Sequence, residues 1–134
     1  MTFEQADKLC DEIVDFLYRS GGYYQQMDEY IGILQTNVLL CLATRQFILH
    51  RDEAVGITGF ICWWYIKPED ITYIRSFKRP SDITSGDLMY VVECGIMGEK
   101  MAALVRDARR FVRKGVTWYN SNRERFEHYG RQQQ

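Results

Sequence analysis

A strand, a glycine turn and a helix follow one another in the second half of the chain, and this order constrains the fold more than any other feature. Residues 88–94 form a largely apolar run, which is typical of a buried strand. Residues 99–114 place apolar side chains at helical spacing, with arginines on the opposite face. Gly115 then ends the helix, and residues 116–119 form a second short strand. Because a helix that crosses between neighbouring strands makes them parallel, we expect a parallel pair in a sheet.

The first part of the chain predicts two helices. Thr2 and Gln5 have the spacing of a capping box, and apolar residues at helical spacing continue from there to a glycine pair that begins at Gly21. A second helical pattern covers residues 27–44. We expect this second helix to break near Thr36, where two polar residues interrupt it, and then to resume.

An antiparallel hairpin is predicted next. Residues 45–51 alternate between polar and apolar side chains, and residues 55–66 are rich in β-branched and aromatic residues. The acidic pair that begins at Asp52 supplies the turn between them. Trp63 and Trp64 fall on opposite faces of the longer strand. We therefore expect at least one of them in the core. The other could also pack there, or it could line a groove or an interface.

In order along the chain, the predicted elements are α-α-β-β-β-α-β-α, with a final short helix over residues 123–129. The hairpin strands are antiparallel and the last two strands are parallel, so the sheet is mixed. We therefore predict a single α+β domain over residues 1–134, with a mixed central sheet, two N-terminal helices and a crossover helix. A chain of 134 residues, of which 46% are hydrophobic, can bury one core of this kind.

The composition argues against several classes of function. A net charge of −1 does not favour general binding to nucleic-acid phosphates, although arginines cluster in residues 106–113. The 4 cysteines lack Cys-x-x-Cys spacing and the 2 histidines lie far apart, so we predict no metal site. Cysteines in apolar runs indicate buried thiols in a reducing compartment, so we expect a cytoplasmic protein. The longest apolar run, residues 38–43, is far too short to cross a bilayer.

Glu93 is the candidate catalytic residue. It ends the predicted strand 88–94 and stands just before the glycine turn, so its carboxylate could act as a general base toward an acceptor amine. The alternative is a strand-end glutamate that is exposed or paired with an arginine. Its neighbour Cys94 points to the opposite face of the strand and is expected to pack in the core.

The turn after Glu93 is the candidate cofactor-binding segment. A glycine turn that leads into a helix presents backbone N–H groups, and the helix dipole favours negative charge there. A plain connecting turn is an equally good interpretation. The candidate residues are Gly95, Ile96, Met97, Gly98, Glu99 and Lys100.

Several segments resemble one known family. Taken together and in order, they are similar to the toxin-activating lysine acyltransferases of RTX haemolysins, which have the GNAT-type acyltransferase fold. The resemblance covers most of the chain, although no single segment is specific. The segments are residues 14–20, 36–39, 45–47, 50–52, 61–63, 85–93 and 125–130.

The resemblance implies transfer of an acyl group from a thioester carrier to an amine. The donor would be acyl-CoA or acyl carrier protein, used as a co-substrate rather than held permanently, and the acceptor would be an amine on a protein. The family relies on an acid at the position of Glu93 and on a histidine at the position of Tyr24, where a tyrosine could donate a proton. In GNAT enzymes the turn matched by residues 95–100 holds the cofactor pyrophosphate, and the tyrosine that protonates the leaving thiolate matches Phe126.

A second hypothesis belongs to another class of function. The replaced histidine and tyrosine fit a catalytically silent GNAT-like module that binds a partner or takes part in assembly. Such a module would suit a phage or mobile-element protein, for example a component of the virion, and it could form homo-oligomers. An enzyme should bind a thioester at residues 95–100, whereas an assembly module should bind a large partner or copies of itself.

Overall fold

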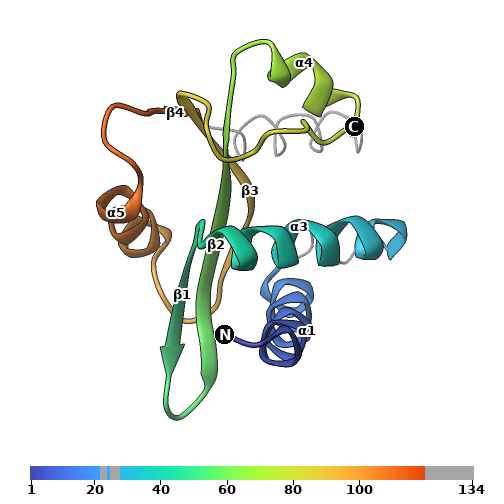
Figure 1. Ribbon diagram of the computed structural model, residues 1–134. Coiled ribbons are helices and arrows are strands. Elements are labelled where there is room, and N and C mark those ends of the chain that lie inside the picture. The colour runs from blue at the N-terminus through green and yellow to red at the C-terminus, as the bar shows by residue number, and fades with distance from the viewer. Residues whose placement is uncertain (22–23, 25–27, 120–134) are drawn as a thin grey trace, which may run out of the picture.

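The computed structural model of the protein describes residues 1–21, 24 and 28–119. Within these residues it has four α-helices, one 3-10 helix and a mixed four-stranded sheet. Figure 1 shows how the labelled helices and strands are arranged. The elements are α1 (Phe3–Ser20), η1 (Asp28–Tyr30), α3 (Ile31–Thr44), β1 (Phe47–Asp52), β2 (Gly56–Ile66), α4 (Asp70–Arg75), β3 (Leu88–Ile96), α5 (Met101–Phe111) and β4 (Thr117–Tyr119). The chain is therefore an α+β protein, as predicted.

The sheet has the strand order β1-β2-β3-β4. β1 and β2 form an antiparallel hairpin, and β2 and β3 are also antiparallel. β3 and β4 are parallel, and their register runs from the pair Leu88–Thr117 to the pair Tyr90–Tyr119. The predicted parallel pair around a crossover helix is confirmed.

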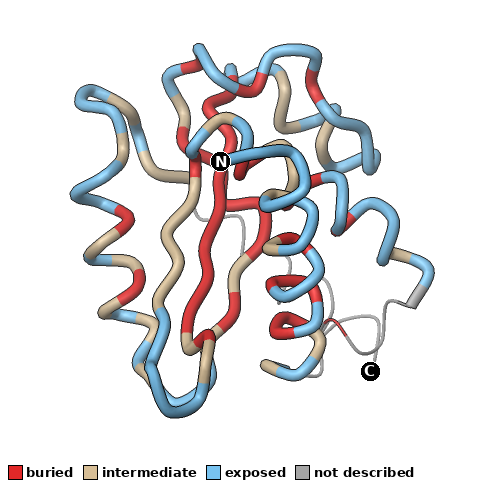
Figure 2. Tube along the Cα trace, turned by 60° about the horizontal axis from the view of Figure 1, so that its bottom comes forward, coloured by how far each residue is buried: buried red, intermediate tan, exposed pale blue. Residues whose placement is uncertain are grey.

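Helices cover both faces of the sheet. α1 and α3 lie on one face and α5 lies on the other (Figure 1). The tube of Figure 2 shows burial concentrated along the central strands β2 and β3. Trp63 packs in the cluster under α5, and Trp64 packs in the cluster under α1 and α3. The two tryptophans therefore occupy opposite faces, as the strand periodicity predicts.

An irregularity in β3 decides where its acidic residue points. The register with β2 pairs Cys62 with Glu93 but Trp63 with Val91, so Val92 is an extra residue in β3. A bulge of this kind lets two successive side chains share a face. Val92 packs with the core under α1 and α3, and Glu93 contacts tyrosines that lie on the same side.

The predicted break in the second helix is wrong, because α3 continues from Ile31 to Thr44. Polar side chains interrupt a helix when they compete for its backbone bonds. Here the Thr36 hydroxyl donates to the carbonyl of Gly32 one turn earlier, at 3.0 Å, and Asn37 bonds a side chain instead. The helix therefore accommodates both residues.

The bounds of two other elements differ from the prediction. α5 spans Met101–Phe111 rather than residues 99–114, because the side chain of Glu99 is held by contacts with the sheet before the helix begins. β3 is longer than expected and takes in Gly95 and Ile96. The short helix α4 was not predicted, and the predicted helix 123–129 lies outside the described residues.

Candidate functional site

Glu93 is wholly buried, at the bulge of β3. The Tyr30 hydroxyl donates to its Oε2 at 3.1 Å, and the Tyr24 hydroxyl lies 3.5 Å from its Oε1. A carboxylate removed from water needs such donors, since burial of a charge without hydrogen bonds is costly. The two oxygens of Glu93 thus face two different tyrosines.

Asn37 fixes the direction of the stronger of these hydrogen bonds. Its side-chain amide, itself buried on α3, donates to the Tyr30 hydroxyl oxygen at 3.3 Å. A hydroxyl carries only one proton, so a hydroxyl that accepts from Asn37 turns its own proton toward Glu93. The order Asn37, Tyr30, Glu93 is therefore a directed chain of hydrogen bonds.

Tyr24 is anchored to the backbone next to Glu93. Its hydroxyl accepts from the N–H of Cys94 at 3.2 Å and lies 3.2 Å from the carbonyl oxygen of the same residue. The contact with Glu93, at 3.5 Å, is longer. The structure therefore brings together Tyr24 and Glu93, the two predicted catalytic residues, and adds a backbone contact that holds Tyr24 in place.

Tyr30 and Asn37 were not predicted as site residues. They stand seven residues apart around α3, which places them on the same helix face as the buried Leu34 and Cys41. A polar pair within an apolar helix stripe was the signal that could have found them. This polar pair forms a site only together with a partner on the sheet, and that partner is Glu93.

A cysteine lies opposite Glu93 but is not a suitable nucleophile. Cys62 pairs with Glu93 across β2 and β3 and is wholly buried. Burial, then the hydrogen bond with Cys41 and the charge of Glu93, raise the pKa of the Cys62 thiol well above its ordinary value of 9.0. Since the thiolate is the reactive form, this cysteine remains a packed thiol.

A pocket of about 440 Å³ lies between α3, β2 and α4. Its volume falls within the range of about 300–1,000 Å³ that is typical of small-molecule sites. Tyr30 and Asn37 line it, so the hydrogen-bond chain to Glu93 begins at the wall of this pocket. A substrate group in the pocket could therefore exchange a proton with Glu93 through Tyr30.

The predicted cofactor-binding turn is largely committed to the sheet. Gly95 and Ile96 pair with residues of β2, and the N–H of Met97 donates to the carbonyl of Thr58 at 2.8 Å. The remaining residues, Gly98, Glu99 and Lys100, connect β3 to α5. Gly98 has a φ of +80°, which a residue with a side chain rarely adopts.

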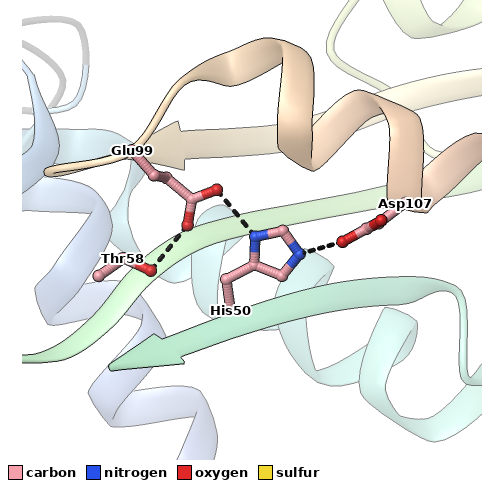
Figure 3. A network of polar contacts seen from close by, with 4 residues as sticks. All are labelled: His50, Thr58, Glu99 and Asp107. Atoms are coloured by element: carbon pink, nitrogen blue, oxygen red, sulfur yellow. Dashed lines mark hydrogen bonds and ion pairs between the residues drawn. The ribbon is translucent and has the colours of Figure 1, made fainter. Parts of the chain in front are cut away.

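Glu99 belongs to a second polar cluster, on the face of the sheet that carries α5. Figure 3 shows His50 between two carboxylates, with its Nδ1 2.8 Å from Glu99 and its Nε2 2.7 Å from Asp107. The Thr58 hydroxyl donates to the other Glu99 oxygen at 2.7 Å. Gly59 leaves space for that carboxylate, because a Cβ there would lie 2.7 Å from it.

The charge state of His50 follows from its two neighbours. Burial, the largest single influence, lowers its pKa, but hydrogen bonds to Glu99 and Asp107 and their charges together raise it above the ordinary value of 6.5. In its imidazolium form His50 can donate from both ring nitrogens, and it then joins β1 to α5. No local pattern predicts this cluster, because the β1–β2 hairpin and residues 99–107 are far apart in the sequence.

The described residues contain neither a metal-ligand cluster nor a membrane-spanning helix. Within them, no three His, Cys, Asp or Glu side chains gather so that they could hold a metal ion. None of the helices in residues 1–21 and 28–119 is both long and apolar enough to cross a membrane.

A search of protein-family models, of curated proteins and of solved structures finds no match to this chain.

Proposed function

We propose that this protein transfers an acyl group from an acyl thioester, either acyl-CoA or acyl carrier protein, to an amine on an acceptor, with Glu93 as the general base. One observation carries the proposal. The wholly buried carboxylate of Glu93 is joined through the Tyr30 hydroxyl to a pocket that Tyr30 and Asn37 line. A general base needs hydrogen-bond reach to the proton that it removes, directly or through one intermediate group.

The proposed proton transfers return Glu93 and both tyrosines to their starting protonation states. The amine nitrogen forms a bond to the thioester carbon, and its proton passes to the Tyr30 oxygen while Tyr30 gives its own proton to Glu93. The carbon–sulfur bond then breaks. Glu93 returns the proton through Tyr24, whose hydroxyl lies 3.5 Å from the other carboxylate oxygen, to the departing thiolate. Glu93 and both tyrosines end as they began.

The donor would lie along β3, with its phosphate near the connection to α5. Gly98 and Lys100 support this placement. Nothing lies within 4 Å of a Cβ built at Gly98, so the backbone is open to a ligand, and Lys100 supplies a positive charge. Gly98→Asp would put a carboxylate at that point and should weaken binding of coenzyme A.

Release of free thiol from acetyl-CoA and from a long-chain acyl carrier protein, in the presence of an amine acceptor, tests the proposal. Glu93→Gln should lower the rate by about 100-fold or more, because general-base catalysis typically contributes that much. Tyr30→Phe should lower it as well. Glu53→Gln, in the exposed turn of the β1–β2 hairpin, is the matched control and should keep the wild-type rate. Equal rates for Glu93→Gln and this control would exclude Glu93 as the base.

A second candidate function is a GNAT-like binding or assembly module without catalysis, working in the cytoplasm or within a phage virion. Glu99 supports it, since a carboxylate just before α5 opposes a phosphate at that helix end. In this function the chain would associate with copies of itself or with a larger partner. Calorimetry that detects no thioester binding, together with self-association in sedimentation, would favour this candidate over acyl transfer.

A further inference from the structure

We propose that the pocket between α3, β2 and α4 binds an organic carboxylate with an apolar body, such as a medium-chain fatty acid. The inference goes beyond acyl transfer, because it concerns binding alone and needs no chemistry at Glu93. Three features of the pocket support it: exposed apolar side chains, the buried N–H of Trp64, and the positive charges of Lys78 and Arg79.

The wall of the pocket carries large apolar side chains that remain exposed. Ile33, Tyr73 and Phe77 line it, and they are 47%, 48% and 79% exposed. Apolar groups gathered around a concave site are typical of a binding surface. These three side chains would lie against the apolar body of a ligand.

The backbone at the end of α4 directs two residues to this wall. Phe77 has a φ of +59°, an unfavourable conformation for a bulky side chain. Its N–H donates to the carbonyl of Ile74 at 2.9 Å, and the N–H of Lys78 donates to that of Tyr73 at 3.3 Å. The strained turn therefore ends α4 and places both Phe77 and Lys78 at the pocket. Strain of this kind is concentrated at functional sites.

A hydrogen-bond donor on the pocket lining finds no acceptor. Trp64 is 4% exposed, lines the pocket and stacks on Tyr90 with ring centres 6.4 Å apart. Its indole N–H is buried and has no hydrogen-bond partner among the described residues. The N–H of Trp63 is in the same position, but that residue lies under α5 on the other face. A ligand oxygen would satisfy the N–H of Trp64 once the side chains that cover this buried group move aside.

The charge of the pocket selects an anion. Lys78 and Arg79 line it, and no Asp or Glu occurs among the described lining residues. The Lys78 ammonium also lies 5.5 Å from the centre of the Tyr73 ring, so the cation is held over the apolar wall. A carboxylate with an alkyl chain is complementary to all three features: charge facing Lys78 and Arg79, chain against the apolar wall, and an oxygen accepting from Trp64.

Calorimetric titration of the full chain with decanoate, decanol and decylamine tests the proposal. Decanoate should bind at one saturable site, and decanol and decylamine should each bind more weakly. Lys78→Gln/Arg79→Gln should weaken decanoate binding at least tenfold and leave decanol unchanged. Arg110→Gln/Lys114→Gln, which removes two exposed cations at and just after α5, is the matched control and should bind decanoate as the wild type does.

A spectroscopic measurement locates the ligand. The indole N–H resonance of Trp64, assigned by its loss in Trp64→Phe, should shift on addition of decanoate. Decanoate binding is measured without thioester or amine, so that failure of acyl transfer and failure of this site remain distinguishable. The proposal is overturned if folded protein does not bind decanoate, if decanol or decylamine binds as tightly, or if the Trp64 resonance stays in place at saturation.

Discussion

At the residue scale, the position of Glu93 depends on a single extra residue in a strand. The register with β2 steps from Glu93 to Val91, and the bulge at Val92 turns Glu93 toward Tyr24 and Tyr30. A regular strand would alternate its side chains and separate Val92 from Glu93. The buried acid, two tyrosines and an amide then form hydrogen bonds with one another beside the pocket.

Removal of one hydroxyl from this cluster should be measurable as a loss of stability. Tyr30→Phe leaves Glu93 Oε2 and the Asn37 amide without their shared partner. We expect the free energy of unfolding to fall by about 1–3 kcal/mol, the usual cost of leaving buried polar groups unpaired. Urea unfolding measures it, with Tyr73→Phe on the exposed side of α4 as the control. Equal midpoints for the two variants would contradict the hydrogen-bond chain.

The sequence could locate one half of this site but not the other. Glu93 and Tyr24 were both found, the first from its place at a strand end and the second from a family resemblance. Tyr30 and Asn37 were not found. Helix periodicity shows that they share a face, but it does not show that this face packs against Glu93 on the sheet. A bulge also has no local sequence pattern, so the direction of Glu93 came only with the structure.

At the element scale, long periodic segments were predicted well and short ones poorly. The hairpin and the parallel pair around the crossover helix agree with the structure. α4 was missed because a helix of six residues is not stable by itself and depends on what surrounds it. α5 begins later than predicted because Glu99 reaches across to Thr58 and His50.

The pairing of β1 with α5 should depend on pH through His50. Its pKa is raised above 6.5 in the folded chain, because Glu99 and Asp107 stabilise the imidazolium. Its contribution to stability is therefore complete below pH 6.5 and is lost as the pH rises through the higher folded pKa. Unfolding measured from pH 5 to 9 should show this loss, and His50→Gln should remove it. A wild-type slope in His50→Gln would assign the effect to other groups.

Two glycine substitutions should have opposite effects on stability. A Cβ at Gly86 would lie 2.1 Å from backbone atoms of Ile66, which cannot yield, so Gly86→Ala should destabilise by about 3 kcal/mol or more. Gly32 lies in α3 with nothing within 4 Å of its Cβ position, so Gly32→Ala should stabilise by about 0.5–1 kcal/mol. Thermal unfolding of both variants checks the packing between the start of β3 and the end of β2.

At the scale of the whole molecule, one sheet separates two polar clusters with different tasks. Glu93 and its tyrosines lie under α1 and α3, beside the pocket. His50 and its two carboxylates lie under α5 (Figure 3). The α+β class followed from the order of elements. The pocket could not be predicted, because its lining comes from α3, β2 and α4, and no local sequence pattern shows that these elements lie side by side.

Detection of the acylated amine is the most direct test of the proposal that Glu93 acts as the base of an acyl transfer. The chain is incubated with an acyl thioester and an amine, and the amide product is quantified by mass spectrometry. We predict product with the wild type and with Glu53→Gln, and a rate at least about 100-fold lower with Glu93→Gln. Product formed at the same rate by all three proteins, or by none of them, would contradict the claim.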